Sequence, residues 1–343
     1  MAENTNLAGL TKADYRGAPS TLCQGCGHNS MASQIVAVLF EMDIVPENVV
    51  KFSGIGCSSK CPTYFLGRSF ALNGLHGRMP SAAQGALFAD TTLKGLGMSG
   101  DGDSASIGMS QFKYAVRRNP NLVYIVANNG VYGLTKGQFS ATAEKGLELK
   151  RQGVNPYSPI DVCIESLVTG ATFVARTFAG DPKQVKTLLK AAFSHRGTAV
   201  LDIISPCVTF NNEDTSFHSY GWAKDHQQVL HDIAYIPKTQ EIMLEGEFKE
   251  GEVREVKLHD GSEIVLKKLE KDYDPTDKAR ALQILIEAAE KNWLLTGLFY
   301  VDANRPTLTD IYDLPEDTPL NRLPESRIRP APETMKMVNE LMF

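Results

Sequence analysis

Residues 122–138 read LVYIVANNGVYGLTKGQ. The first six are continuously apolar, as in a strand that is buried on both faces of a sheet, and a loop rich in Asn, Gly and Thr follows at once. Three further apolar runs, at 49–52, 96–99 and 199–204, also end in unusual loops, namely SGIGCSSKC, GDGDSASIG and SPCVTFNN. Because ligands collect at the carboxyl ends of parallel strands, these four loops predict one shared site.

Helical patterns separate the apolar runs along the chain. They cover residues 30–43, 108–118 and 182–195, the last with Gly197 as its expected cap, and a further strand is expected at 171–177. This alternation predicts an α/β fold with a mostly parallel sheet that helices cover on both faces. Cysteine-rich and glycine-rich loops are confined to the first part of the chain, so we expect a site domain at residues 1–225.

Residues 226–343 are expected to form a C-terminal extension. A charged hairpin is predicted within 245–275, around the sequence HDGS, and a helix at 278–293. The tail at 305–329 is rich in Pro and Asp, and two interpretations remain open for it: a segment that wraps over a neighbouring chain, or a solvated extension.

Composition narrows the class of protein. The chain has 343 residues, 22% of them charged, and a formal net charge of −5, which gives no basis for binding nucleic acid or an anionic membrane. No apolar run approaches the roughly 20 residues of a membrane-spanning helix. The first residues lack the pattern of a signal peptide, so a cytoplasmic location is expected, where thiols stay reduced.

The cysteines are distributed as in a metal or cluster site. Cys23 and Cys26 form a CxxC pair, Cys57 and Cys61 lie in the Gly/Ser-rich loop after residues 49–52, and Cys207 follows the last apolar run. A CxxC pair with a third Cys in a glycine-rich turn favours metal binding over simple burial. Thiolates suit both an iron–sulfur cluster and zinc, so spacing alone leaves both open.

Two loops carry the groups that a magnesium ion and a diphosphate require. Asp101 in GDGD offers a carboxylate, Asn129 in NNG an amide oxygen and Val131 a backbone carbonyl. Mg²⁺ takes such oxygen ligands together with water and phosphates. The neighbouring glycines let backbone N–H groups approach the phosphates. The two loops therefore predict a metal-bound diphosphate.

An overlapping motif points to a different cofactor. Residues 95–100, GLGMSG, match the GxGxxG spacing of dinucleotide-binding loops. Such a loop needs an acidic residue about 20 positions later to bind the ribose, but no Asp or Glu lies between Asp103 and Glu144. A nicotinamide-dependent dehydrogenase is therefore the weaker alternative.

Together these motifs resemble those of the β subunits of 2-oxoacid:ferredoxin oxidoreductases. GDG followed by NN is similar to the diphosphate signature of thiamine-diphosphate enzymes, and CxxCGH, GIGC, HGR, NNGVYGLTKGQ and SPC complete the set. The resemblance covers residues 15–225, with a fainter match at VDANRPTLTD in the tail. It implies the thiamine-diphosphate-binding fold, with thiamine diphosphate, Mg²⁺ and a [4Fe–4S] cluster as cofactors.

The resemblance also implies roles for single residues. The cluster ligands would be Cys23, Cys26, Cys57 and Cys207, and the Mg²⁺ ligands Asp101, Asn129 and the Val131 carbonyl. Thiamine diphosphate would contact Ile55, Gly56, Cys57, Ser58, His76, Gly102, Asp103, Gly133 and Leu134. Lys60 would lie near the substrate carboxylate, with Lys136 beside these loops. Cys61 is expected next to the cluster ligands without binding iron, and Cys163 in the core.

The activity implied is CoA-dependent oxidative decarboxylation of 2-oxoglutarate to succinyl-CoA and CO₂, or its reverse, with electrons leaving through the cluster to ferredoxin. Pyruvate is the alternative substrate, giving acetyl-CoA, and a non-redox thiamine-dependent decarboxylase half is a further alternative. Only one GDG…NN unit fits in this chain. A larger α subunit is therefore expected to supply the glutamate that activates the cofactor and the pocket for CoA and substrate, in an α2β2 assembly.

Overall fold

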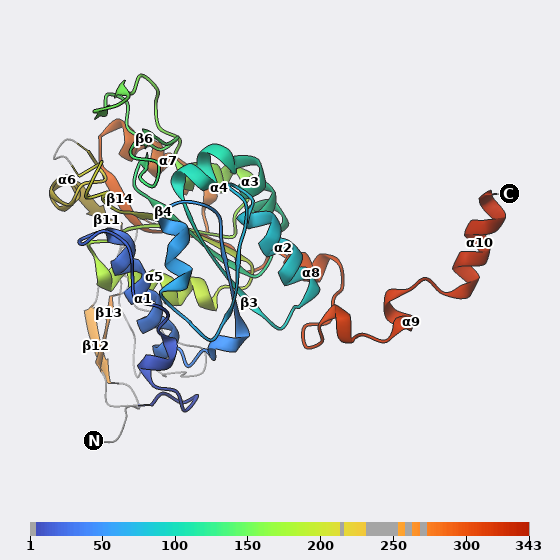
Figure 1. Ribbon diagram of the computed structural model, residues 1–343. Coiled ribbons are helices and arrows are strands. Elements are labelled where there is room, and N and C mark those ends of the chain that lie inside the picture. The colour runs from blue at the N-terminus through green and yellow to red at the C-terminus, as the bar shows by residue number, and fades with distance from the viewer. Residues whose placement is uncertain (1–4, 213–215, 231–252, 258–262, 268–272, 343) are drawn as a thin grey trace.

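An eight-stranded sheet forms the centre of the computed structural model, which describes residues 5–212, 216–230, 253–257, 263–267 and 273–342 (Figure 1). The strand order is β11-β14-β9-β10-β4-β3-β1-β2, and every neighbouring pair is parallel except β14 with β9. The strands are β1 (Val49–Ser53), β2 (Phe70–Asn73), β3 (Lys94–Gly100), β4 (Leu122–Asn128), β9 (Phe173–Phe178), β10 (Thr198–Ile204), β11 (Gln227–Val229) and β14 (Leu294–Val301). The mostly parallel sheet predicted from the sequence is confirmed.

Helices cover both faces of this sheet, as predicted. One face carries α1 (Gly27–Glu41) and α5 (Pro182–Ser194). The other face carries α2 (Met79–Ala89), α3 (Met109–Arg118), α4 (Val162–Thr169) and α7 (Lys278–Glu290). All seven residues of β4 are buried, because helices cover it on both sides, and this explains its continuous apolar sequence.

Helix α5 illustrates how local sequence sets an element's bounds. The Asp181 side chain caps its start by accepting a hydrogen bond from the Gln184 N–H at 3.1 Å, and Pro182 occupies the first turn. The helix ends at Ser194 with His195 as its cap. Gly197, predicted as the cap, lies two residues further on, where its φ of 120° turns the chain into β10.

Part of the expected extension belongs to the central sheet. Strand β14, which follows α7, pairs antiparallel with β9, and the sequence pattern did not reveal it. The predicted hairpin is present as β12 (Val253–Lys257) paired with β13 (Glu263–Lys267), whereas its turn at 258–262 lies outside the described residues. Two short ribbons sit nearer the site: β5 (Val131–Tyr132) with β6 (Gln138–Phe139), and β7 (Glu148–Leu149) with β8 (Gly153–Val154).

The tail has two parts. Around α8 (Leu308–Ile311) it packs on the chain's own body, where Asp310 forms an ion pair with Arg196 at 2.5 Å. From η5 (Leu320–Arg322) onward, α9 (Glu325–Ile328) and α10 (Pro332–Met342) extend away from the body (Figure 1). The remaining short elements are α6 (Tyr220–His226), η1 (Lys12–Tyr15), η2 (Pro46–Asn48), η3 (Ser58–Thr63) and the π-helical turn η4 (Gly102–Ile107).

Within the described ranges, no helix combines the length and the apolarity that crossing a membrane would require.

Candidate functional site

The four predicted loops meet because their strands are neighbours. Strands β1, β3, β4 and β10 lie side by side in the sheet and run in the same direction, so their carboxyl ends share one edge. A pocket opens at this edge. Its walls include all the residues predicted to contact thiamine diphosphate or Mg²⁺: Ile55, Gly56, Cys57, Ser58, His76, Asp101, Gly102, Asp103, Asn129, Val131, Gly133 and Leu134.

Asp101 is fixed at the end of β3 by donors from two other segments. Its side chain is 1% exposed. One carboxylate oxygen accepts from the Asn129 N–H at 3.3 Å, and the other accepts from the hydroxyls of Thr142, at 2.8 Å, and Ser140. The Asn129 side-chain oxygen in turn accepts from the Val131 N–H at 3.2 Å. The three predicted magnesium ligands therefore lie in one hydrogen-bonded unit.

Asp103 fixes the neighbouring wall of the pocket. Its buried carboxylate accepts from the Gly77 N–H at 2.7 Å and the Ile55 N–H at 3.3 Å, and it contacts His76 Nδ1 and the Ser99 hydroxyl. These four partners come from two separate loops and from strand β3. The structure thus gives Asp103 a role that the sequence did not predict, which is to hold His76 and the 54–56 loop in position.

Two glycines allow this close packing. A Cβ at Gly54 would collide with the Asp103 carboxylate, and a Cβ at Gly102 would collide with the ring of Tyr132. The Tyr132 hydroxyl donates to the Gly102 carbonyl at 3.1 Å. Any larger side chain at either position would displace a wall of the pocket.

The four predicted cluster thiols gather beside the pocket. A Cβ on Gly133, which lines the pocket, would lie 3.5 Å from Cys207 Sγ and 3.7 Å from Cys57 Sγ. The Cys26 N–H donates to the Cys23 carbonyl at 3.2 Å, which forms a tight turn between these two residues. The thiols of Cys57 and Cys207 are therefore adjacent to the wall that Gly133 forms.

Burial and mutual proximity set the acidity of these thiols. Burial, with a contribution from the Cys207, Cys23 and Cys57 thiols, raises the pKa of Cys26 to about 11. Burial likewise raises the pKa of Cys57 and of Cys207. A metal that binds here must displace these protons, which couples assembly of the site to pH.

The predicted cluster ligands are also the ligands that a zinc site would use. In the parts of the chain that the structure describes, no three His, Cys, Asp or Glu side chains are arranged to hold a single metal ion. A mononuclear zinc site requires all four sulfurs about 2.3 Å from one centre. A cubane takes the same four thiolates, so the assignment of a cluster and not zinc stays a prediction.

A buried lysine shapes the loop that carries Cys57. Lys51 Nζ, on β1, donates to the carbonyls of Pro62, Phe65 and Leu66 at 2.7–2.8 Å. These bonds hold the chain that follows η3 against the sheet. Burial lowers the Lys51 pKa to about 8.

The other predicted residues have distinct surroundings. Cys61 is buried and its thiol points to the His28 carbonyl at 3.9 Å, and Cys163 is buried in the core, as expected. Lys60 is exposed in η3 next to Cys57, whose carbonyl accepts its N–H at 3.2 Å, but it does not line the pocket.

His28 is a pocket residue that the sequence did not single out, although it belongs to the CQGCGH motif. It lines the pocket and is 1% exposed, and neither ring nitrogen has a hydrogen-bond partner among the described residues. Burial lowers its pKa to about 4, so the ring is neutral. An unpaired buried imidazole at a pocket wall fits a bound polar group that supplies the missing partner.

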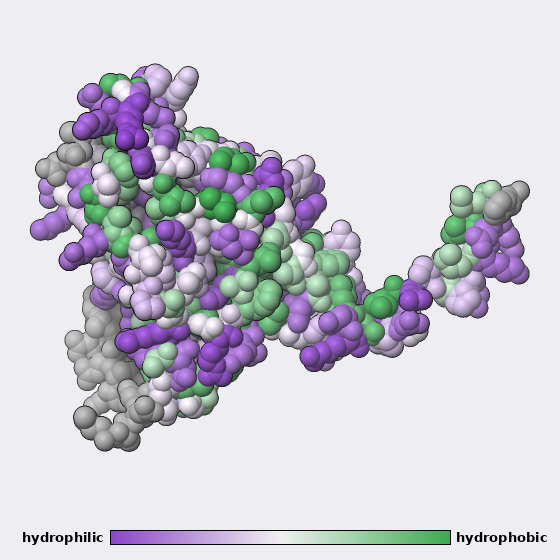
Figure 2. All heavy atoms as spheres, in the orientation of Figure 1, coloured by the Kyte–Doolittle hydropathy of each residue, from purple (hydrophilic) through white to green (hydrophobic). Residues whose placement is uncertain are grey.

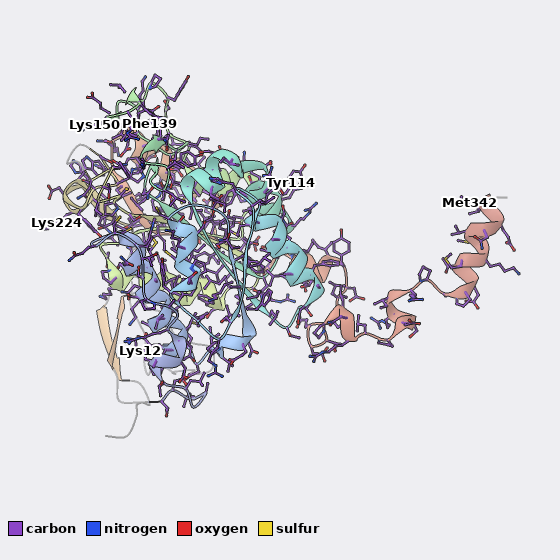
Figure 3. All side chains as sticks on the ribbon, viewed as in Figure 1. Lys12, Tyr114, Phe139, Lys150, Lys224 and Met342 are labelled. Atoms are coloured by element: carbon purple, nitrogen blue, oxygen red, sulfur yellow. The ribbon has the colours of Figure 1, made fainter. Side chains whose placement is uncertain are left out.

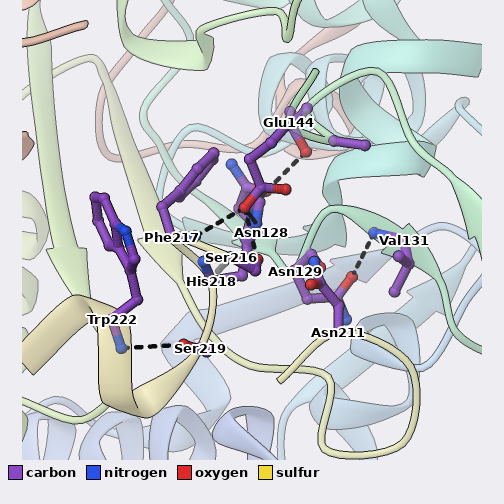
Figure 4. Close-up of polar contacts among 12 residues, drawn as sticks. Asn128, Asn129, Val131, Glu144, Asn211, Ser216, Phe217, His218, Ser219 and Trp222 are labelled. Atoms are coloured by element: carbon purple, nitrogen blue, oxygen red, sulfur yellow. Dashed lines mark hydrogen bonds and ion pairs between the residues drawn. The ribbon is translucent and has the colours of Figure 1, made fainter. Parts of the chain in front are cut away.

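A buried chain of hydrogen bonds lies behind the loops that carry Asp101 and Asn129, and Figure 4 shows its part around Asn128, Glu144 and His218. Thr142 Oγ1, which donates to Asp101, also lies 2.8 Å from Asn128 Oδ1. His218 Nε2 lies 3.0 Å from the same oxygen, and His218 Nδ1 lies 3.1 Å from Glu144 Oε1. His218 is thereby linked to Asp101 through the side chains of Asn128 and Thr142. Such contacts between loops far apart in the sequence cannot be read from it.

With this geometry established, comparison with known proteins identifies the family. Residues 54–203 match the family model described as thiamine pyrophosphate enzyme, C-terminal TPP binding domain. Residues 265–315 match the model for the C-terminal part of the pyruvate ferredoxin oxidoreductase beta subunit. A 2-oxoglutarate synthase subunit, KorB, from Methanocaldococcus jannaschii is 35% identical over 56% of this chain and 71% of its own length. The chain belongs to the family of 2-oxoacid:ferredoxin oxidoreductase β subunits. This confirms the family predicted from the sequence.

Two further relatives of this β subunit extend the comparison. The 2-oxoacid:ferredoxin oxidoreductase subunit beta of Saccharolobus solfataricus is 41% identical over 197 residues, which are 56% of this chain and 64% of that protein. The chain thus matches less than two thirds of the length of that relative. The solved 2-oxoglutarate:ferredoxin oxidoreductase of Magnetococcus marinus, with 2-oxoglutarate, coenzyme A and succinyl-CoA bound, aligns over 89% of both chains with a TM-score of 0.71 and 29% identity.

Proposed function

We propose that this chain is the cofactor-binding β subunit of a CoA-dependent 2-oxoglutarate:ferredoxin oxidoreductase, with thiamine diphosphate, Mg²⁺ and one [4Fe–4S] cluster. The observation that carries the proposal is the shared sheet edge, where Asp101, Asn129, Val131 and Cys57 line one pocket and Cys207 lies against its Gly133 wall. The cofactor residues all fall within 1–225. We assign 226–343 to the fold and to assembly.

The pocket fits a metal-bound diphosphate. Asp101 and Asn129 are buried and pre-oriented, so an ion binds without reordering their side chains. The unpaired His28 nitrogens offer a hydrogen bond to the bound molecule. Thiamine diphosphate would supply the electron sink for decarboxylation, while this chain binds and orients it and keeps Cys57 at its side.

The thiols of Cys23, Cys26, Cys57 and Cys207 suit a cluster that would accept electrons from a cofactor bound in the pocket beside Asp101. Cys57 itself lines the pocket, and Gly133, which also lines it, lies against the thiols of Cys57 and Cys207. Oxidative chemistry requires such an acceptor, whereas a non-redox decarboxylase does not. We therefore favour the oxidoreductase over the non-redox alternative, and we place it in the cytoplasm, where the free thiols stay reduced.

A second chain is needed to complete the site. The cavity at the sheet edge has a volume of about 90 Å³, which holds several water-sized groups, such as a diphosphate. A complete ligand site encloses roughly 300–1,000 Å³. We propose that the pocket is closed by an α subunit that brings the activating glutamate and the CoA site, in an α2β2 enzyme. The substrate-proximal role of Lys60 belongs to the same proposal, because Lys60 is exposed and available to such an interface.

The substrate assignment is tested with the complex purified anaerobically with its partner. We expect 2-oxoglutarate to be the best substrate in a panel of 2-oxo acids with CoA and a viologen acceptor, because both the M. jannaschii and the M. marinus relatives carry that substrate in their names. The chain purified alone is expected to show no turnover. Pyruvate turning over severalfold faster would contradict the substrate, and full activity of the isolated chain would contradict the divided site.

The hydrogen bonds that link His218 to Asp101 through Asn128 and Thr142 yield a separate prediction. His218→Ala removes the bond to Asn128, and Asn128 and Asp101 share the Thr142 hydroxyl. Outer partners of metal ligands typically contribute about 10–100-fold in metal affinity, so we expect the apparent Kd for Mg²⁺, measured by calorimetry with thiamine diphosphate, to rise about tenfold. His226→Ala is the matched control, since His226 stacks on Trp222 and does not contact this chain of bonds. Equal Kd values for the two variants would refute the coupling.

A further inference from the structure

A cationic pocket opens next to the cysteines predicted to hold the cluster, which are Cys23, Cys26, Cys57 and Cys207 and are called the thiol group below. It is separate from the pocket that Asp101 and Asn129 line. Its rim carries four cations and two carboxylates: Lys136, Lys145, Lys150, Arg151, Glu144 and Glu148. The four cations are exposed, and among the described residues none of them has an ion pair. The cavity volume is about 1,080 Å³. In a chain with a formal net charge of −5, this is a local reversal of sign.

Glu144 turns its carboxylate toward the interior and away from the open side of the rim. Its carboxylate accepts hydrogen bonds from the Ser216 hydroxyl at 2.6 Å and the Phe217 N–H at 2.9 Å, and it faces His218. These bonds turn it inward (Figure 4). The outward face is therefore dominated by the lysines and the arginine, and Figure 2 shows strongly hydrophilic side chains gathered at this end of the molecule.

The wall of this pocket is the loop that follows Cys207. Thr209 and Phe210 line it, and the Thr209 hydroxyl lies 3.7 Å from Cys23 Sγ. Cys207 and Phe210 also pack against a small apolar cluster that contains Leu147 and Leu149, so the cationic loop is anchored directly to the thiol loop. Cys23 is itself exposed. A molecule seated here would be in contact with the edge of the cluster site.

We infer that this cationic pocket, defined by Lys136, Lys145, Lys150 and Arg151, is the docking surface for a small acidic electron-carrier protein. The inference rests on the proposed function, because it needs an electron-donating cluster at the thiol group. Electron-transfer encounters use small interfaces and gain speed from opposite charge. Exposed lysines spread around a redox group suit that encounter, whereas a tightly bound small anion would require buried donors that converge.

The first test compares electron acceptors on the holoenzyme complex. Lys145→Glu/Lys150→Glu reverses two rim charges, and Lys12→Glu/Arg16→Glu reverses two at the opposite end of the molecule, where Lys12 is labelled in Figure 3. With an acidic ferredoxin at low salt, we expect kcat/KM to fall about tenfold or more for the rim variant only, and the loss to shrink as salt rises. Reduction of methyl viologen, a small cation, is expected to stay within about twofold of wild type in both variants.

Cross-linking gives a readout that does not depend on turnover. A carbodiimide should join ferredoxin carboxylates to Lys145 or Lys150, and peptide mapping would locate the bonds. Three results in the rim variant would each overturn the inference: an unchanged kcat/KM for ferredoxin, a raised KM for CoA, or loss of the α subunit on gel filtration. Viologen reduction in all variants would leave the proposed function intact. A wild-type complex that reduces neither acceptor would overturn both.

Discussion

Asp101→Asn is expected to abolish cofactor binding and turnover. The substitution keeps the size of the side chain and its place between Ser140, Thr142 and the Asn129 N–H, but it removes the negative charge that a magnesium ion requires. We expect the affinity for thiamine diphosphate with Mg²⁺ to fall by more than about 100-fold, beyond the loss typical of an outer partner. Calorimetry on the complex would measure this.

Asp225→Asn is the control for loss of one carboxylate, because Asp225 is exposed on α6. It should bind the cofactor as wild type does. If the Asp101 variant bound thiamine diphosphate within a few-fold of wild type, with the same dependence on Mg²⁺, the metal site would have to lie elsewhere.

Cys207→Ser is expected to remove the iron–sulfur cluster. A serine leaves one corner of a cubane without its thiolate, so iron content and the broad absorption around 400 nm should be lost after anaerobic purification. Electron transfer to any acceptor should be lost with them. Thiamine diphosphate should still bind, because Cys207 does not line the pocket beside Asp101.

Cys61→Ser is the matched control for that experiment. Cys61 lies in the same loop as Cys57, but it is buried and directed at the His28 carbonyl. Its substitution should leave the cluster in place. Cluster loss in the Cys61 variant with retention in the Cys207 variant would show that the ligand set is misassigned.

The central fold was predictable because its signals are local. β4 and β10 are buried on both faces, which favours largely apolar sequences, and their polar loops mark the carboxyl ends. By contrast, β14 escaped prediction although its sequence is apolar, because its place beside β9 depends on a contact between residues more than a hundred positions apart. Edge strand β2 is exposed throughout and carries no burial pattern at all.

The residues of the candidate site also fall into two sets, those that the sequence predicts and those that only the structure reveals. Asp101, Asn129 and the cysteines could be predicted, since short motifs with characteristic chemistry carry them. The residues that orient them could not. Thr142 reaches Asp101 from 41 positions away, and His218 reaches Asn128 from 90 positions away. Only the folded chain reveals that these side chains meet.

The central claim is that one sheet edge holds an iron cluster and a magnesium-bound diphosphate side by side. The most direct test is a crystal structure of the complex purified anaerobically with thiamine diphosphate, with diffraction recorded at the iron absorption edge. We expect a single anomalous peak enclosed by the sulfurs of Cys23, Cys26, Cys57 and Cys207, with diphosphate density against Asp101 and Asn129. An anomalous peak away from these sulfurs, or diphosphate bound at another edge of the sheet, would contradict it.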